Sequence, residues 1–149
     1  MDSAFEYAET NALETEDSYP YRAVDQVCNA NPSVGKVKTT GFVDVPVNDP
    51  LQLQAAVAQG PVSVAIQAGS NYFRSYSHGI MSSTDCGSNL DHGVLVIGYG
   101  TDENGTDYWL LKNSWGVTWG DFGLFKILRT SDHGVGICGL QQKASYPLV

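Results

Sequence analysis

The stretch from residue 89 to residue 121 constrains the fold of this chain more than any other, because it predicts a β-hairpin with polar side chains at its open end. Residues 93–99 form an apolar run rich in β-branched side chains, and residues 108–112 form a second apolar and aromatic run. The segment between them, residues 100–107, holds two Gly, one Asn, two Asp and two Thr, which is typical of a turn. We therefore expect two antiparallel strands that fold back near residues 103 and 104.

This fold-back brings the position before the first strand opposite the position after the second, and those positions hold His92 and Asn113. An amide oxygen that accepts one ring N–H of a histidine fixes the tautomer and leaves the other ring nitrogen available. The pair then resembles the base and the orienting residue of a nucleophilic site. The structural alternative is a histidine whose ring is merely satisfied by a neighbouring acceptor. Nearby tryptophans, which we expect to shield the pair from water, favour the site: Trp109, Trp115 and Trp119.

Length and charge limit the classes of function that fit. The 149 residues, 42% of them hydrophobic, allow one domain or slightly more with a sizeable core. The net charge of −8 argues against nucleic acid as a partner. The sequence has no run of eighteen apolar residues and no signal-peptide pattern at its start, so we expect no membrane span and no start of a secreted precursor at Met1.

The rest of the chain reads as a few short elements in an α+β order. Patterning predicts a helix near the start with Asp2 or Ser3 as its cap, and an ordered surface connection over residues 14–32. It also predicts strands at 36–45, 62–68 and 123–129, a helix at 51–59, and loops at 69–88 and 130–142. We expect an antiparallel sheet or open barrel.

Several stretches together resemble the papain family of cysteine proteases, close to its cathepsin L branch. They are MDSAFEYAETN, EDSYPYRA, GPVSVAI, CGSNLDHGVLVIGYG, YWLLKNSWGVTWGDFG, CGL and ASYP. The resemblance implies a papain-like α+β fold in which residues 1–36 are a remnant of the helical left domain and residues 37–149 form the barrel-like right domain. It implies that His92 and Asn113 are catalytic, with Trp115 covering their hydrogen bond, and that the reaction is peptide-bond hydrolysis without a metal or organic cofactor.

The chain departs from the family pattern at the nucleophile. The family places its His and Asn about 130 to 150 residues after the catalytic Cys. Counting back by this spacing from His92 and Asn113 puts the expected Cys about 37 to 38 residues before Met1. None of the three cysteines, Cys28, Cys86 and Cys138, lies in a G-S-C-W context. We therefore expect the C-terminal part of an endopeptidase that is inactive alone and needs a missing N-terminal segment.

The resemblance also implies how the cysteines pair. It pairs Cys86 with Cys138 and gives Cys28 a partner in the absent segment or in a separate light chain. A buried free thiol is the alternative for Cys28. Disulfides agree with a lysosomal, vacuolar or extracellular compartment, which the family implies.

Substrate contacts carried over from the family are more specific. The resemblance implies that Met1, Ala65, Leu90, Asp91 and Gly93 line the pocket for the second residue before the scissile bond, and that Trp115 faces the leaving side. Lys143 falls where the family closes the base of that pocket, and an ammonium group there favours an acidic over a bulky apolar side chain. The alternative is that Lys143 bends outward and keeps its charge in water.

Other interpretations stay open. Three histidines and two cysteines could suggest a metal site, but the spacing of His78, His92, His133, Cys86 and Cys138 fits no closed zinc pattern. A catalytically silent binding or structural protein, or a heavy chain that works with a separate light chain, would keep the fold without the nucleophile. Finally, residues 104–106 form a glycosylation sequon, Asn-Gly-Thr, in the predicted hairpin loop.

Overall fold

The computed structural model describes residues 1–149, which form two compact units. The first unit contains Met1–Val43 and Pro147–Val149, and the second contains Asp44–Tyr146. A domain boundary at residue 36 stays a prediction. None of the helices is both long enough and apolar enough to cross a membrane.

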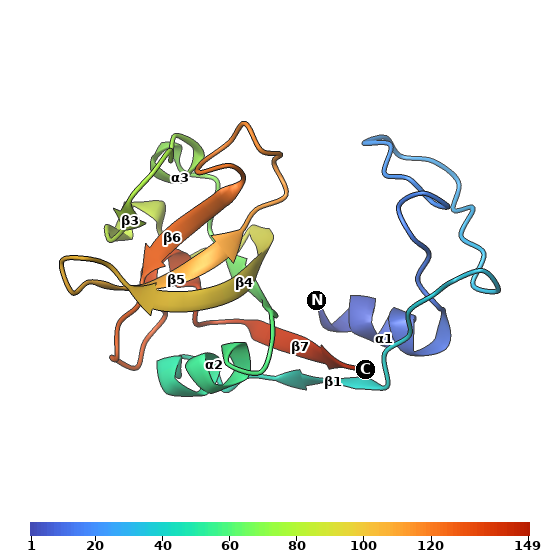
Figure 1. Ribbon diagram of the computed structural model, residues 1–149, viewed down its shortest axis with the longest axis horizontal. Helices are drawn as coiled ribbons and strands as arrows, with labels where there is room; N and C mark the ends of the chain where they lie inside the picture. Colours follow the sequence, from blue (N-terminus) through green and yellow to red (C-terminus); the bar gives the residue numbers. More distant parts are fainter. The chain divides into compact units, whose positions relative to one another are not determined.

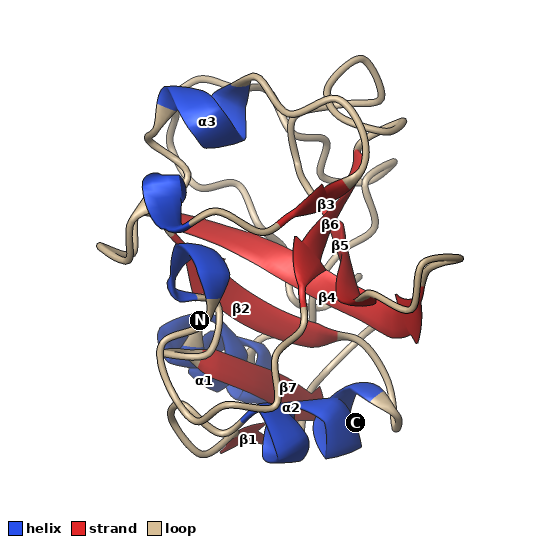
Figure 2. Cartoon of the chain, turned by 90° about the vertical axis from the view of Figure 1, so that its left-hand side faces the viewer, coloured by secondary structure: helices blue, strands red, loops and turns tan.

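Seven strands form the sheet, in the order β1-β7-β2-β4-β5-β6-β3 (Figures 1 and 2). The strands are β1 (Gly41–Asp44), β2 (Val62–Ile66), β3 (Ile80–Met81), β4 (His92–Thr101), β5 (Asp107–Lys112), β6 (Leu124–Leu128) and β7 (Ala144–Leu148). The helices are α1 (Asp2–Thr10), α2 (Pro50–Val57) and α3 (Asn71–Arg74), with 3-10 turns η1 (Thr84–Cys86) and η2 (Ile137–Gly139). In the second unit β4 pairs antiparallel with β2 and β5, and β5 with β6, while β3 and β6 are parallel.

The hairpin predicted from residues 93–112 is confirmed by the pairing of β4 with β5. The ladder runs from Thr101 opposite Asp107 to Leu95 opposite Lys112, so the turn lies at residues 102–106. A bulge between Val96 and Gly98 shifts the register by one residue. The β4–β5 hairpin is the centre of the sheet because β4 also pairs along its first half with β2.

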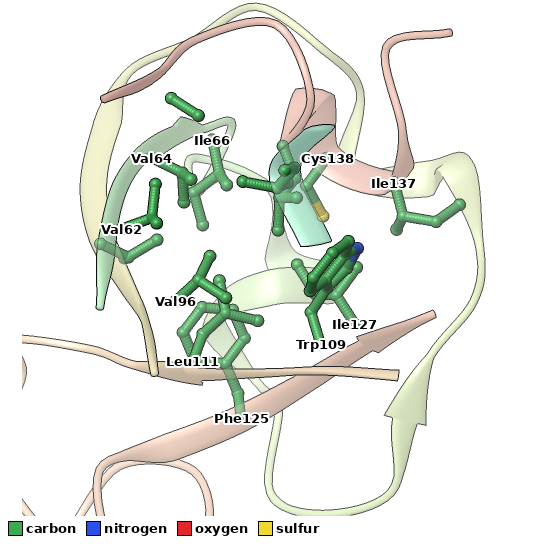
Figure 3. Packing of buried hydrophobic residues seen from close by; sticks show 14 of the residues in the cluster. Val62, Val64, Ile66, Val96, Trp109, Leu111, Phe125, Ile127, Ile137 and Cys138 are labelled. Atoms are coloured by element: carbon green, nitrogen blue, oxygen red, sulfur yellow. The ribbon is translucent and has the colours of Figure 1, made fainter. Parts of the chain in front are cut away.

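The core of the second unit lies on one face of these central strands, where every second residue is apolar and buried (Figure 3). On β2 the buried residues are Val62, Val64 and Ile66, and on β6 they are Phe125 and Ile127. Alternation of this kind fixes the strand register, since a slip by one residue would expose the whole apolar set. The register in turn sets where the strand ends present their polar residues.

The first unit is built on α1, whose buried residue is Ala8. Thr39 donates its backbone N–H to the Ala8 carbonyl at 3.2 Å and its hydroxyl to the Phe5 carbonyl at 3.1 Å. The expected Asp2 or Ser3 cap is wrong: Met1 is the N-cap and its side chain makes no capping bond, because the helix begins at Asp2 itself. Residues 14–36 contain no helix or strand. Hydrogen bonds from side chains join parts of this segment, for example the Glu14 carboxylate, which accepts the Asn31 N–H at 2.7 Å.

Two strand expectations need correction. The strand expected at residues 36–45 is only Gly41–Asp44, because Val37 instead forms an isolated bridge with Leu13. The strand β7 was not expected, since Pro147 lacks a backbone N–H and the sequence there reads as a tail. In the second unit β7 pairs with β2 through Ala144 and Ser145, the residues before the proline.

Loss of the Cys86–Cys138 disulfide should destabilise the chain. The bond closes a span of 52 residues, which the chain-entropy argument values at about 4 kcal/mol. We expect the double variant Cys86→Ser, Cys138→Ser to lose free energy of unfolding on this scale in urea titrations. Cys28→Ser is the matched control, because Cys28 is exposed and unpaired. Equal stability of the double variant and this control would contradict the expectation.

The hairpin turn should contribute stability that depends on pH. The Asp102 carboxylate accepts the backbone N–H of Thr106 at 2.7 Å and of Asn104 at 3.0 Å, and these bonds, Thr106 first, lower the pKa of Asp102. A carboxyl whose pKa falls on folding stabilises the fold above its unfolded-state pKa, and this contribution disappears as pH drops through the folded-state pKa. The stability difference between the wild type and Asp102→Ala should therefore be largest near neutral pH and shrink in acid. A difference that is constant with pH would refute this role.

Candidate active site

The structure brings His92 and Asn113 together at one end of the hairpin. His92 is the first residue of β4, and Asn113 directly follows β5. Their side chains meet with His92 Nε2 at 2.9 Å from Asn113 Oδ1. Asn113 is only 6% exposed, and its backbone N–H donates to the Gly123 carbonyl at 2.9 Å, which fixes the residue beside β6.

The two residues are not directly opposite, as the fold-back alone predicts. The last ladder pair is Leu95 with Lys112, so continuing the register would set Val94 across from Asn113. The His92 ring therefore reaches the amide diagonally. Diagonal cross-strand neighbours lie within reach of long or aromatic side chains, which is why the contact forms despite the offset.

The hydrogen bonds around Asn113 determine the tautomer of His92. The backbone N–H of Ser114 lies 2.8 Å from the same Asn113 Oδ1 that faces His92. A backbone N–H can only donate, so that atom must be the amide oxygen, which only accepts. His92 Nε2 must therefore hold a hydrogen, and in the neutral ring Nδ1 is left as the proton acceptor.

Asn113 is costly to keep in this position. Its amide nitrogen Nδ2 is buried and has no hydrogen-bond partner. A buried unsatisfied polar group typically costs about 1–3 kcal/mol. Because an apolar residue of similar size would avoid this cost, the position of Asn113 is better explained by the orientation of His92 than by stability.

An aromatic cluster covers one face of the His92 ring. The Trp115 ring lies 5.0 Å from the His92 ring between centroids. Trp115 and Trp119 are 5.2 Å apart, and both pack against Phe73, which is fully buried. The cluster anchors Trp115 to the core, while Trp115 itself remains 39% exposed.

The expectation that Trp109 shields the pair is wrong. Trp109 is buried in the core cluster that also contains Ile127, Ile137 and Cys138 (Figure 3). The aromatic ring that it contacts is Tyr99 on β4. Trp109 shares a face of β5 with Asn113 but lies four residues away, roughly 13 Å along a strand. The shielding comes from the loop after β5 instead.

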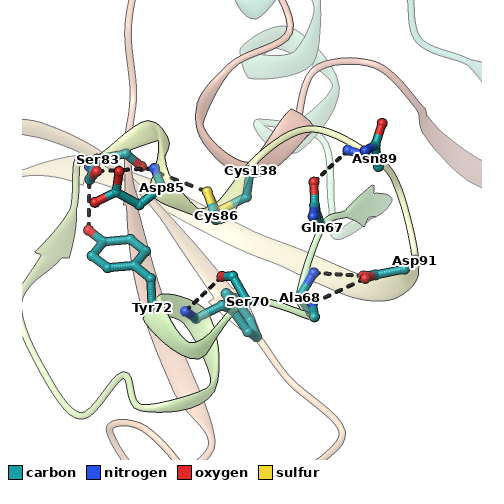
Figure 4. The surroundings of a disulfide bond; sticks show 12 residues. Gln67, Ala68, Ser70, Tyr72, Ser83, Asp85, Cys86, Asn89, Asp91 and Cys138 are labelled. Carbon is teal, nitrogen blue, oxygen red and sulfur yellow. Dashed lines mark hydrogen bonds between the residues drawn. A yellow bond between two sulfur atoms is a disulfide. The ribbon is translucent and has the colours of Figure 1, made fainter.

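Asp91 holds the start of β4 in place. Its carboxylate accepts the backbone N–H of Ala68 at 2.6 Å and of Gly69 at 3.1 Å (Figure 4), and its own N–H donates to the Ile66 carbonyl at 3.0 Å. These bonds tie the residue before His92 to the end of β2. The structure thus gives Asp91 a positioning role that the sequence did not suggest.

A surface hollow of about 200 Å³ opens beside the pair. It is lined by Ala68, Gly69, Arg74, Asp91, His92 and Trp115. Arg74 comes from the C-terminal end of α3 and was not singled out from the sequence, because a lone arginine in a loop-rich stretch has no distinguishing pattern.

Three of the expected substrate-pocket residues, Gly93, Ala65 and Lys143, are neighbours on adjacent segments of the backbone. Gly93 pairs with Ala65 across β4 and β2, and Ala65 donates its N–H to the Lys143 carbonyl at 2.9 Å. Leu90 is 37% exposed in the preceding loop, and Met1 belongs to the first unit. Lys143 is exposed and lines a separate hollow of about 290 Å³ with Asp44, Val45 and Val47 among its walls. The roles of these residues in substrate binding stay predictions.

The expected disulfide between Cys86 and Cys138 is confirmed. Both thiols are therefore consumed, and Cys28 is the free cysteine, exposed in the first unit. No three His, Cys, Asp or Glu side chains gather in a way that could hold a metal ion.

The hydrogen-bond geometry predicts the histidine tautomer in solution. In nitrogen-15 spectra of the neutral ring, His92 should show a protonated Nε2 and an unprotonated Nδ1. Asn113→Ala should weaken this preference because the acceptor for Nε2–H is lost, whereas His78, which is exposed and far from Asn113 in sequence, should be unaffected. A neutral His92 with its hydrogen on Nδ1 would contradict the geometry.

Comparisons with known proteins agree with the fold. The chain matches the family described as "Papain family cysteine protease" over residues 1–148. It is 49% identical to cathepsin L1 of Drosophila melanogaster, covering 100% of this chain but 40% of that protein. The structure of digestive procathepsin L 3 of Tenebrio molitor superposes with a TM-score of 0.92 at 43% identity, covering 100% of this chain and 48% of the other. Bromelain from Ananas comosus, in complex with the E64 inhibitor, has a TM-score of 0.91 at 36% identity, covering 99% of this chain and 68% of that one. The fold is therefore papain-like, and the chain, which spans less than half the length of its curated cathepsin L relative, belongs to the papain family of cysteine proteases.

Proposed function

We propose that this chain supplies the base and the orienting residue of a cysteine endopeptidase that hydrolyses peptide bonds through an acyl-thioester. The observation that supports it most is the 2.9 Å contact between His92 Nε2 and Asn113 Oδ1, which leaves Nδ1 as a proton acceptor on a residue that lines the hollow. A cysteine protease needs such a nitrogen beside its sulfur.

The proposed reaction uses His92 as base and then as acid. Nδ1 takes the proton of the cysteine thiol, giving a thiolate and an imidazolium. The thiolate attacks the peptide carbonyl, and the imidazolium returns the proton to the leaving amine as the C–N bond breaks. Water then adds to the thioester carbonyl as one of its protons passes to Nδ1. The C–S bond breaks and releases the carboxylic acid, and the imidazolium returns the proton to the sulfur. Asn113 keeps Nε2–H bound throughout, so that the ring does not turn away.

The nucleophile in this proposal is a cysteine outside these 149 residues. Cys86 and Cys138 are joined in a disulfide, and Cys28 lies in an irregular exposed segment without the family's G-S-C-W context. The chain spans only 40% of the length of cathepsin L1, which is consistent with a further segment that provides this residue. The exposed Cys28 thiol would be its covalent link, whether the segment is continuous or a separate light chain.

We propose peptide and protein substrates with pockets on both sides of His92. Ala65, Leu90 and Gly93 would contact the second residue before the scissile bond, and Trp115 with the hollow beside Asp91 would take the leaving side. Lys143 lines a separate hollow, so its proposed preference for an acidic side chain requires its ammonium group to turn toward the first pocket.

The compartment that fits is oxidising or lysosomal. The Cys86–Cys138 disulfide favours a lysosomal, vacuolar or extracellular location, because reduced compartments seldom keep such a bond. The net charge of −8 argues against nucleic acid as a partner.

Activity measurements with and without a nucleophile test the proposal. The chain alone should not cleave a fluorogenic peptide, and the chain assembled with a segment that bears the papain-type cysteine should. In that assembly His92→Ala should lower kcat by at least roughly 10²–10⁴-fold, the usual contribution of a general acid–base residue. His78→Ala is the matched control, since its ring bonds only to Ser77 at 2.9 Å and lies outside the site. Full activity of His92→Ala in the assembly, or alkylator-sensitive turnover by the chain alone, would refute the proposal.

A further inference from the structure

We propose that Asn104, at the tip of the β4–β5 hairpin, is a site of N-linked glycosylation. Residues 104–106 read Asn-Gly-Thr, the acceptor pattern for an oligosaccharide transferred in the secretory route. It is the chain's one usable sequon, because the other match, Asn31-Pro32-Ser33, has proline in the middle position, which blocks transfer. The inference rests on the proposed compartment and is independent of the proposed catalytic roles.

The loop leaves room for a glycan. Glu103, Asn104 and Gly105 are all exposed, and a Cβ atom built on Gly105 would meet no atom within 4 Å. Gly105 has φ +80°, a left-handed conformation that glycine adopts without strain, so the turn is sharp and projects away from the strands. In Figure 1 this loop extends freely at the end of the hairpin, on the left of the view.

The turn is held together without depending on the amide that would be modified. Asp102 and Thr106 close it by a backbone bond, Asp102 N–H to the Thr106 carbonyl at 2.9 Å, and Gly105 N–H donates to the Asp102 carbonyl at 3.1 Å. The Asp102 carboxylate accepts two further backbone N–H groups, from Asn104 and Thr106. The Asn104 side chain adds only a bond to this same carboxylate, which is already well satisfied. A glycan on its nitrogen would therefore leave the turn in place.

The location is compatible with catalysis. His92 begins β4 and the loop follows Thr101 at its other end, so roughly 30 Å of extended strand separates the sugar from the histidine. A glycan there would cover the exposed tip of the hairpin and leave the hollow beside His92 and Trp115 open to peptides.

The experiment directs the full 149-residue chain into the secretory route behind a cleavable signal, in a mammalian cell line. The chain is then treated with peptide N-glycosidase, which removes the glycan and leaves aspartate at residue 104. We expect a glycosidase-sensitive mobility shift in the wild type that is absent in Asn104→Gln and Thr106→Ala. Thr106→Ser is the matched control and should keep the shift, because serine also completes a sequon.

A second variant reports entry into the lumen independently. Pro32→Ala turns Asn31-Pro32-Ser33 into a sequon in an exposed part of the first unit. The proposal would be overturned if the signal-cleaved, protease-protected chain of this variant carried a glycan at Asn31 but none at Asn104. A glycosidase-sensitive shift that persists in Asn104→Gln would overturn it as well. Because transfer occurs on the chain as it is made, none of these outcomes depends on protease activity.

Discussion

The site depends on one oxygen atom, Asn113 Oδ1, which accepts hydrogen bonds from both the Ser114 N–H and His92 Nε2. The backbone donor fixes which end of the amide faces the histidine, and the amide then fixes the histidine tautomer. The Ser114 backbone N–H thereby sets the orientation of the Asn113 amide, which could otherwise rotate by half a turn. The cost is an unsatisfied Asn113 Nδ2, which the fold tolerates in the buried end of the hairpin.

The sheet provides the rigidity that this arrangement needs. β4 is held on both sides by β2 and β5, so His92 starts from a strand with two neighbours, and Asp91 fastens the preceding residue to the end of β2. Trp115 is held against the ring by Phe73, which belongs to α3 and lies in the core. Reactive groups kept in place by packing and backbone bonds lose little freedom on meeting a substrate, and this positioning is one contribution that a scaffold makes to catalysis.

Much of this was predictable from the sequence, and the failures have physical reasons. Residues 93–112 combine β-branched runs with a Gly-Asn-Asp turn, so the hairpin and the meeting of His92 with Asn113 follow from local patterns. The bulge near Gly98 and the diagonal contact depend on long-range packing that no local pattern encodes. The sequence does not predict β7, because Pro147 interrupts the strand pattern. Trp109 is close to Asn113 in sequence but lies in the core, since four residues along an extended strand separate the two by roughly 13 Å. Family resemblance, not spacing, gave the Cys86–Cys138 pairing, and the part played by Asp91 emerged only from its contacts.

A crystal structure of the chain together with a segment that carries the proposed cysteine, trapped by a thiol-reactive substrate analogue, would show the reacting atoms themselves. We expect the modified sulfur to lie beside Nδ1 of His92, with Nε2 still bound to Asn113 Oδ1 and the Trp115 ring still covering the pair. A structure in which the sulfur approaches Nε2, or in which Asn113 has turned its oxygen away from the ring, would contradict this expectation.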